Sequence, residues 1–300
     1  MKVFLTGATG FLGTHILNQC INNNFQILSL TRQKNIFQNS KNVKWIYSDL
    51  TNIKFIINEV NNFNPDIVIH LAWEGIPDYS AEKSLINHYN SINLFNNLLK
   101  NKQIKKIICA GSCWEYPQRI GKCKESDIAY PTSYFTWAKI SLYEYLKLKC
   151  LSNKIDLYWF RIFYLYGPGQ RKDSIIPSIV NSFKKNTAPI INNPFYENDF
   201  IYVKDAAKML LKPLLLTVPP GIYNIGTGKT ISVIEICRLI EKQILNNNIF
   251  TKSIDNKKNI NYKTSYFADT AKMIENLKTS YLINIEIGIN EYIKSVSKES

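Results

Sequence analysis

Short, largely apolar runs recur along the first part of the chain, and they constrain its fold more than any other feature. They occupy residues 3–5, 27–30, 66–71, 106–110 and 157–163. Stretches whose apolar residues follow helical spacing separate them, as at residues 53–60 and 85–92. Strands buried on both faces lack polar alternation, and such strands alternating with helices indicate βαβ units. The sequence therefore predicts an α/β fold built on a parallel sheet.

A glycine-rich turn follows the first apolar run. It reads Thr6-Gly7-Ala8-Thr9-Gly10-Phe11-Leu12-Gly13, and a helical stretch begins there. Glycines at these positions permit a tight turn, close approach of the backbone to a pyrophosphate, and close contact between helix and strand. The helix N-terminus adds free N–H groups and the positive end of a dipole. This context predicts a Rossmann-type doubly wound sheet that binds a dinucleotide at Gly7, Thr9, Gly10, Phe11, Leu12 and Gly13.

The end of the second apolar run bears on the choice between the two nicotinamide dinucleotides. It reads Leu30-Thr31-Arg32, where an NAD site commonly places Asp or Glu on the ribose hydroxyls. An arginine at this place can instead bind a 2′-phosphate. Thr31 and Arg32 therefore favour NADP(H), with NAD as the alternative; an arginine that simply faces water is the other interpretation.

The second half of the chain has a looser pattern. Loops at residues 167–170 and 192–194 surround two helical stretches at 205–216 and 232–245. We predict an NAD(P)-binding Rossmann domain at residues 1–165 and a smaller C-terminal substrate-binding lobe at 166–300, with the two interleaved.

The composition is that of a soluble globular chain. Apolar residues make up 45% and charged residues 20%, which excludes disorder and collagen-like repeats. Subtracting 23 acidic from 37 basic residues gives a net charge of +14, but the basic residues are scattered. No nucleic-acid partner is therefore expected. The first apolar run is too short for a signal peptide, and no run reaches the roughly 18 residues of a membrane span.

Cysteine and histidine usage points to a reducing compartment and to no metal. The six cysteines include no Cys-x-x-Cys pair, and the chain has only three histidines. Neither a metal site nor a disulfide framework fits this pattern. We therefore expect a cytoplasmic protein with reduced thiols and no membrane partner.

Further landmarks follow the glycine turn along almost the whole chain. They are Ser48-Asp49-Leu50, His70-Leu71-Ala72-Trp73 with Asn90, the segment 111–116, and the segments 161–169, 199–205 and 223–228. In this order they resemble those of the extended short-chain dehydrogenases/reductases, the NAD(P)-dependent epimerase/dehydratase family that acts on nucleotide sugars. The resemblance implies cofactor contacts from Asp49, Leu50, Leu71, Ala72 and Trp73.

The resemblance also implies a catalytic Ser or Thr together with a Tyr and a Lys four residues apart. Ser112 and Lys139 fit, and Lys139 would also hold the nicotinamide ribose. Phe135, however, stands where the tyrosine belongs, and Tyr134 lies five residues before Lys139. Residues five apart on a regular helix differ by about 140° around its axis.

Two hypotheses follow from this mismatch. In the favoured one, a one-residue bulge restores the Tyr134–Lys139 pair, and Ser112, Tyr134 and Lys139 are catalytic. In the other, Phe135 occupies the site and proton transfer is lost or done otherwise, at a cost of about 10²–10⁴-fold in rate.

Cys113 and Trp114 bear on the reaction. They stand where family dehydratases carry acidic residues, and Glu115, one place later, is expected to face away. Dehydration is therefore not expected. We predict NADPH-dependent 4-keto reduction of a nucleoside-diphosphate deoxysugar for surface polysaccharide synthesis. The alternatives are an NAD-dependent C4 epimerase or dehydrogenase and, in another class, a non-catalytic NADP-binding sensor.

Substrate contacts and a partner subunit complete these expectations. The predicted substrate-binding residues are Ser112, Cys113, Trp114, Tyr164, Arg171 and Asn198. Asn198 and Tyr164 replace an Arg and an Asn of the family, and Arg171 can supply the missing charge. The helix after Pro131 is apolar on most sides, so a face beyond the sheet needs cover. A second copy of the chain is the expected partner, and the rest of the same chain is the alternative.

Overall fold

The structure is a computed structural model that describes residues 1–33, 41–117, 120–255, 265–279 and 281–297. The chain separates into two compact units. Unit 1 contains Met1–Pro117, Glu125–Ile162 and Ala207–Tyr223, and the remaining described residues form unit 2. The predicted domain boundary at residue 165 lies close to Ile162, and the stretch from Ala207 is a later return of the chain to unit 1.

Unit 1 is built on a seven-stranded sheet with the order β11-β7-β5-β4-β1-β2-β3. The strands are β1 Lys2–Thr6, β2 Gln26–Thr31, β3 Val43–Tyr47, β4 Ile67–His70, β5 Lys106–Ser112, β7 Asp156–Ile162 and β11 Gly221–Ile225. β1 pairs in parallel with both β2 and β4, so the strand order reverses around β1. All of the predicted runs are strands, and the α/β doubly wound fold is confirmed.

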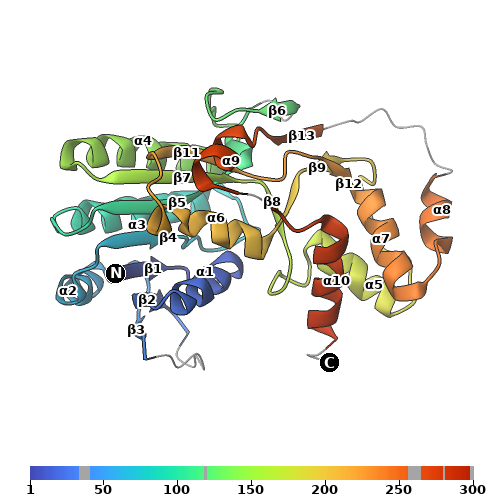
Figure 1. The fold of residues 1–300 in the computed structure, drawn as a ribbon, viewed down its shortest axis with the longest axis horizontal. Coiled ribbons are helices and arrows are strands. Elements are labelled where there is room, and N and C mark those ends of the chain that lie inside the picture. The colour runs from blue at the N-terminus through green and yellow to red at the C-terminus, as the bar shows by residue number, and fades with distance from the viewer. Residues whose placement is uncertain (34–40, 118–119, 256–264, 280, 298–300) are drawn as a thin grey trace. The chain divides into compact units, whose positions relative to one another are not determined.

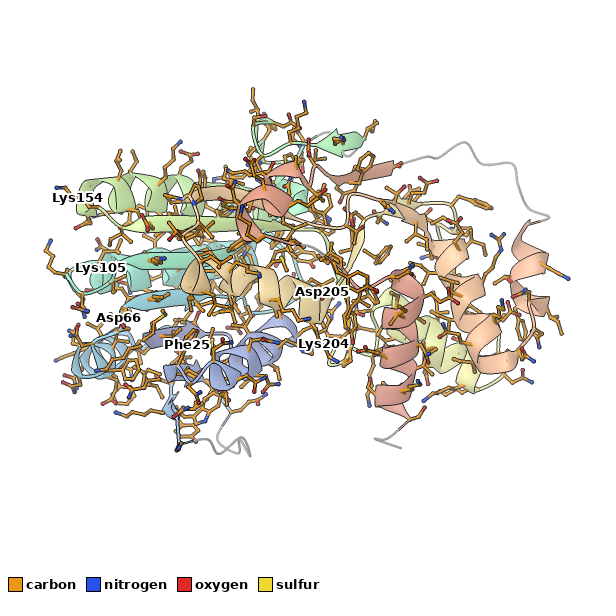
Figure 2. All side chains as sticks on the ribbon, viewed as in Figure 1. Phe25, Asp66, Lys105, Lys154, Lys204 and Asp205 are labelled. Carbon is orange, nitrogen blue, oxygen red and sulfur yellow. The ribbon has the colours of Figure 1, made fainter. Side chains whose placement is uncertain are left out.

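The orientation of the strands places their carboxyl ends along one edge of the sheet. Phe25, Asp66, Lys105 and Lys154 each stand just before a strand, and Figure 2 shows the four at the same edge. The carboxyl ends therefore lie at the opposite edge. In doubly wound sheets ligands bind there, beside the point where the strand order reverses.

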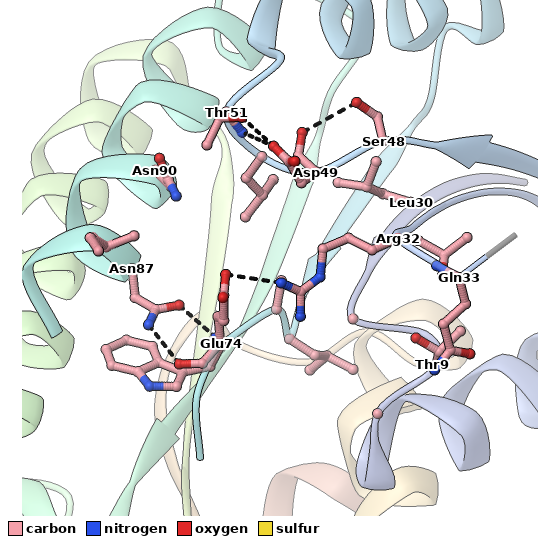
Figure 3. A pocket seen from close by; sticks show the side chains of 18 residues that line it. Thr9, Leu30, Arg32, Gln33, Ser48, Asp49, Thr51, Glu74, Asn87 and Asn90 are labelled. Atoms are coloured by element: carbon pink, nitrogen blue, oxygen red, sulfur yellow. Dashed lines mark hydrogen bonds and ion pairs between the residues drawn. The ribbon is translucent and has the colours of Figure 1, made fainter. Parts of the chain in front are cut away.

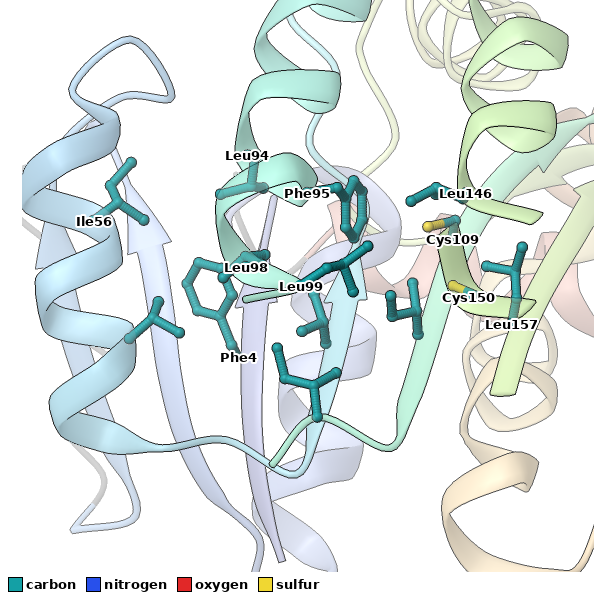
Figure 4. Close-up of a cluster of buried hydrophobic side chains, with 14 of the residues drawn as sticks. Phe4, Ile56, Leu94, Phe95, Leu98, Leu99, Cys109, Leu146, Cys150 and Leu157 are labelled. Carbon is teal, nitrogen blue, oxygen red and sulfur yellow. The ribbon is translucent and has the colours of Figure 1, made fainter. Parts of the chain in front are cut away.

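Helices cover the sheet of unit 1. They are α1 Phe11–Asn22, α2 Ile53–Phe63, α3 Ala81–Leu98 and α4 Tyr134–Asn153, with α6 Val203–Leu215 and the short 3₁₀ helix η1 Cys113–Glu115. Figure 4 shows Ile56 of α2, Leu94 and Phe95 of α3 and Leu146 of α4 packed in one buried cluster with Phe4 of β1. Burial of these side chains stabilises unit 1. The helical spacing of the apolar residues predicts it, because each helix packs one apolar stripe against the sheet.

Unit 2 has two small sheets and its own core. β8 Tyr164–Tyr166 pairs in parallel with β10 Phe200–Tyr202, and a four-stranded sheet has the order β12-β9-β13-β6. Its strands are β6 Gly121–Cys123, β9 Glu197–Asn198, β12 Ile231–Ser232 and β13 Ser265–Ala268. The helices are α5 Ile175–Lys184, α7 Val233–Leu245, α8 Ile249–Asp255, α9 Ala271–Leu277 and α10 Ile285–Val296. Ile179, Phe183, Ile236 and Ile240 lie in the core of this unit.

Candidate active site

The glycine turn joins β1 to α1 at the carboxyl edge of the sheet. Gly7 has a φ of +77°, and a Cβ there would stand 2.8 Å from the backbone nitrogen of Ala72. A Cβ at Gly13 would overlap the carbonyl oxygen of Gly7. Glycine is therefore required at both positions, because the turn and the first turn of α1 pack backbone against backbone.

A pocket of about 520 Å³ opens beside this turn, within unit 1. Figure 3 shows the side chains around it. Ten of the predicted cofactor-binding residues line it: Gly7, Thr9, Gly10, Thr31, Arg32, Asp49, Leu50, Leu71, Ala72 and Trp73. Phe11, Leu12 and Gly13 form the first turn of α1. The volume is in the range of small-molecule sites.

Charged side chains from two strand ends meet across the pocket. The Nη1 atom of Arg32, after β2, lies 3.1 Å from Oε2 of Glu74, after β4. Nζ of Lys83 lies 3.8 Å from the other Glu74 oxygen. The Asp49 carboxylate accepts hydrogen bonds from the backbone and the hydroxyl of Thr51. These bonds, with a smaller contribution from the charge of Arg32, lower the pKa of Asp49.

A chain of buried polar groups supports the wall of the pocket. His70, at the end of β4, lies 2.9 Å from the Thr6 hydroxyl through Nδ1 and 3.0 Å from the Ser91 hydroxyl through Nε2. Ser91 Oγ donates to the carbonyl of Asn87 at 2.7 Å, and Ala72 N donates to Thr6 Oγ1 at 3.4 Å. The chain connects β1, β4 and α3 beneath the pocket.

Ser112 ends β5 and is held by its own loop. Its hydroxyl accepts a hydrogen bond from the backbone N–H of Trp114, and its N–H donates to Oε1 of Glu115 at 2.8 Å. Glu115 is buried and pairs with Nε of Arg161 at 2.9 Å. The indole of Trp159 donates to the same carboxylate. Glu115 therefore fixes the Ser112 loop from inside the unit.

Lys139 lies on α4 and is buried. Its Nζ donates to the carbonyl of Ala110 at 2.9 Å and stands 4.4 Å from the ring centre of Trp73. Burial lowers the pKa of Lys139 to about 8, although the charge of Glu115 acts in the opposite direction. An ammonium group with this pKa can hold or release a proton near neutral pH.

The start of α4 corrects the expected bulge. Residues 134–153 form a continuous α-helix. Ser133 Oγ accepts the Thr136 N–H at 3.2 Å, Thr136 Oγ1 accepts the Ser133 N–H at 2.9 Å, and Trp137 N donates to Ser133 O at 2.9 Å. This capping box starts regular helix at Tyr134, so no extra residue rotates Tyr134 toward Lys139. Tyr134 is 62% exposed, and its catalytic role stays a prediction.

Phe135 occupies the place beside Lys139. Its ring centre lies 5.9 Å from Lys139 Nζ and 5.0 Å from the ring of Trp73. Tyr79 and Trp114 contact the same ring at 4.9 and 6.0 Å, with edge-to-face geometry. Such contacts hold Phe135 firmly, but a phenyl ring can neither donate nor accept a proton at a sugar oxygen.

The predicted substrate residues fall into both units. Ser112, Cys113 and Trp114 belong to unit 1, whereas Tyr164, Arg171 and Asn198 belong to unit 2. Tyr164 accepts a hydrogen bond from the Tyr266 hydroxyl at 3.0 Å, and Arg171 forms an exposed ion pair with Asp173. Asn198 lies on β9. Their roles toward a substrate stay predictions.

The pocket residues fit a nicotinamide dinucleotide. The glycines leave the backbone bare where side chains would fill the space, and Arg32 supplies a cation. Trp73 Nε1 is buried and has no hydrogen-bond partner among the described residues, as expected of a group that awaits a ligand. Gly7, Thr9, Gly10, Arg32 and Asp49 would hold the adenosine diphosphate half.

Other kinds of site find no support within the described part of the chain. There, no group of three or more His, Cys, Asp or Glu side chains could hold a metal ion. No described helix is long and apolar enough to cross a membrane. All six cysteines are buried, and none of them forms a disulfide.

Sequence reasoning missed two pocket residues that matter most for its geometry. Glu74 follows Trp73 directly, so its position just past the end of β4 was a signal. Asn87 lies within α3, where Ser84, Asn87 and Ser91 repeat at helical spacing and are all buried. A polar stripe on a buried helix face was the available signal for Asn87.

Comparison with known proteins shows the family of the chain. The model of the NAD dependent epimerase/dehydratase family matches residues 3–226. A putative UDP-glucose 4-epimerase of Methanocaldococcus jannaschii is 29% identical over 257 residues, which is 81% of this chain and 82% of the relative. A dTDP-4-dehydro-6-deoxyglucose reductase of Escherichia coli is 28% identical over 258 residues, 80% of each chain.

The fold has a close counterpart among solved structures. The crystal structure of UDP-glucose 4-epimerase from Thermotoga maritima with UDP-glucose superposes with a TM-score of 0.84 at 18% identity, over 100% of this chain and 99% of that one. The family match spans most of the chain and includes both the glycine turn and Lys139. The chain therefore belongs to the NAD dependent epimerase/dehydratase family.

Proposed function

We propose that the protein is an oxidoreductase that uses NADPH to reduce the 4-keto group of a nucleoside-diphosphate deoxysugar, in the cytoplasm, for surface polysaccharide synthesis. The Escherichia coli relative is named as a reductase of such a sugar. Arg32 in the pocket supports NADP(H). Cys113 and Trp114 offer no carboxylate for dehydration. An NAD-dependent C4 epimerase or dehydrogenase is the alternative, and the epimerase is supported by the Methanocaldococcus jannaschii relative, which is named as a putative UDP-glucose 4-epimerase.

Phe135 is the observation that carries the choice of reduction. Epimerisation and oxidation must both remove a proton from a sugar hydroxyl, which requires a positioned base. Reduction of a ketone only delivers a proton to an oxygen that becomes strongly basic as hydride arrives. The loss of a tyrosine therefore costs a one-way reductase less than it costs an epimerase.

Ser112 and Lys139 can perform the remaining steps. A bound nicotinamide dinucleotide supplies the hydride. The Ser112 hydroxyl can donate a hydrogen bond to the ketone oxygen and polarise it. The Lys139 ammonium, buried and with its pKa lowered to about 8, supplies the proton that this oxygen takes up. Glu115 keeps Ser112 in position from the interior.

The test measures NADPH oxidation with a panel of 4-keto nucleotide sugars. We expect turnover that Ser112→Ala and Lys139→Met each reduce by about 10²-fold or more. The proposal replaces the predicted catalytic role of Tyr134 by Lys139, so Tyr134→Phe is expected to leave turnover unchanged, whereas Phe135→Tyr is expected to raise it. Loss of turnover in Tyr134→Phe would instead identify Tyr134 as the proton donor. Rapid C4 epimerisation without net NADPH consumption would reject the reductase.

Phe135 also favours a second candidate from another class. If Lys139 does not deliver the proton, the site binds NADP(H) without chemistry and the protein acts as a sensor. Stoichiometric dinucleotide binding together with absence of turnover on the whole panel is the result that distinguishes it.

We further propose a homodimer. Leu148 and Leu151 on α4 are 68% and 78% exposed, and Tyr89 on α3 is 66% exposed. Exposed apolar side chains of this size on neighbouring helices are typical of a subunit interface. Sedimentation at twice the chain mass, reduced to the chain mass by Leu148→Glu with Leu151→Glu, is the expected result.

A further inference from the structure

Beside Arg32 the pocket contains a carboxylate, Glu74, that the sequence patterns did not predict there. Glu74 stands 3.1 Å from Arg32 and 3.8 Å from Lys83, and it lines the pocket together with Arg32. The other pocket carboxylate, Asp49, is bound by Thr51. Glu74 is therefore the acidic group that engages the guanidinium in this structure.

Asn87 holds the main chain of Glu74 at this place. Its side-chain Oδ1 accepts the Glu74 N–H at 2.7 Å, and its Nδ2 donates to the Glu74 carbonyl at 2.9 Å and to the Lys83 carbonyl at 2.7 Å. Asn87 is only 6% exposed. Figure 3 shows these hydrogen bonds of Asn87 beside the Arg32–Glu74 ion pair. The Glu74 carboxylate is thus presented to Arg32 from a fixed backbone.

We propose that Glu74 competes with the 2′-phosphate of NADP(H) for Arg32 and is a residue that sets the cofactor preference. This inference rests on the proposed use of NADP(H). A guanidinium binds carboxylate and phosphate through the same planar donors. A 2′-phosphate must therefore exchange with Glu74, whereas a ribose that lacks the phosphate leaves the ion pair intact.

The exposure of the pair sets the size of the effect. The Arg32 and Glu74 side chains are 60% and 45% exposed, so water and salt screen their attraction. Exchange is therefore feasible, and the preference for NADP(H) is lowered rather than abolished. Removal of the carboxylate is expected to strengthen NADP⁺ binding by about fivefold, the upper range for an exposed pair.

The experiment titrates the purified protein with NADP⁺ and with NAD⁺ by isothermal calorimetry at low salt. Glu74→Gln keeps the size of the side chain and removes its charge. Glu82→Gln is the matched control, because it removes a carboxylate from the exposed first turn of α3. The gain in NADP⁺ affinity is expected in Glu74→Gln alone, with NAD⁺ affinity unchanged in both variants.

The double variant Arg32→Gln with Glu74→Gln tests the route of the effect. Competition for Arg32 predicts that Glu74→Gln gives no gain when Arg32 is already replaced. The proposal is overturned if NADP⁺ affinity does not rise in Glu74→Gln, if NAD⁺ gains equally, or if the gain persists without Arg32. Failure of the unaltered protein to bind either dinucleotide would instead reject the proposed function.

Discussion

Two arginine–glutamate pairs in unit 1 have nearly the same length and opposite surroundings. Arg161 and Glu115 stand 2.9 Å apart with side chains 3% and 1% exposed, whereas Arg32 and Glu74 stand 3.1 Å apart at 60% and 45%. Distance therefore says little about what such a pair does. The buried pair cannot exchange its partner without stranding a charge, and the exposed pair can.

The two pairs accordingly serve different parts of the site. Glu115 also accepts hydrogen bonds from Ser112 and Trp159, so the buried pair fixes the loop of the proposed catalytic Ser112. The Arg32–Glu74 pair is exposed in the pocket, where the 2′-phosphate is proposed to bind. Rigid geometry is needed where a proton moves, and an exchangeable charge is useful where a ligand must enter and leave.

Removing one carboxylate from each pair is expected to give the largest difference, in the free energy of unfolding. Glu115→Ala leaves Arg161 buried without its carboxylate and is expected to lower the free energy of unfolding by about 3–5 kcal/mol. Glu74→Ala is expected to lower it by less than about 1 kcal/mol. Urea denaturation of both variants measures the two values. Equal losses would mean that burial does not separate the pairs.

Lys139, a third cation of unit 1, extends the comparison to the dependence on pH. Burial acts to lower the pKa of Arg161, but the charge of Glu115 raises it overall. Lys139, bonded to the Ala110 carbonyl, has its pKa lowered by burial to about 8. Above this pH the ammonium is lost, so kcat/KM for ketone reduction is expected to fall by about tenfold per pH unit.

The matched variant for this pH profile is Lys139→Arg. Arginine stays protonated throughout the range, so the decline near pH 8 is expected to vanish although the rate is lower. A decline that persists unchanged in Lys139→Arg would assign it to another group and remove Lys139 as the proton donor.

Salt gives the smallest expected effect and acts on the exposed pair alone. Between 0.05 and 0.5 M KCl, screening should weaken NADP⁺ binding about threefold more than NAD⁺ binding, because only NADP⁺ adds a phosphate beside Arg32. The stability gap between wild type and Glu115→Ala should stay constant over the same range. Calorimetry and urea denaturation at both salt concentrations measure these quantities. An equal salt response of the two dinucleotides would contradict the placement of the phosphate at Arg32.

Sequence patterns predicted the strands and the turn whose conformation is set by residues close to one another in the chain. The apolar runs gave β1, β2, β4, β5 and β7, and the glycine turn gave the entrance to α1. The edge strand β3, Val43–Tyr47, was missed because Lys44 is exposed and its neighbours are only partly buried. β11, Gly221–Ile225, was missed because it returns to the sheet after a long excursion of the chain.

The site was less predictable because its key contacts join distant residues. No pattern near Arg32 in the sequence predicts its ion pair with Glu74. The two residues meet only because β2 and β4 run parallel in the same sheet. The prediction of a bulge in α4 was wrong for a local reason that is visible in the sequence. Ser133 and Thr136 have the spacing of a capping box, and such a box fixes where regular helix begins.

The buried polar chain through His70 has a direction. Ser91 gives its single hydroxyl hydrogen to Asn87, so its oxygen must accept from Nε2 of His70, and Nδ1 then accepts the Thr6 hydroxyl. Burial, with a smaller contribution from Lys139, lowers the pKa of His70 to about 3, so the ring stays neutral at neutral pH and the hydrogen bonds select its tautomer. The hydrogen bonds therefore all run in one direction, from the N–H of Ala72 to the main-chain carbonyl of Asn87. Ser91 thus links His70 of β4 to the main chain of α3 at Asn87, and a substitution at Ser91 is expected to disturb the hydrogen bonds on both sides.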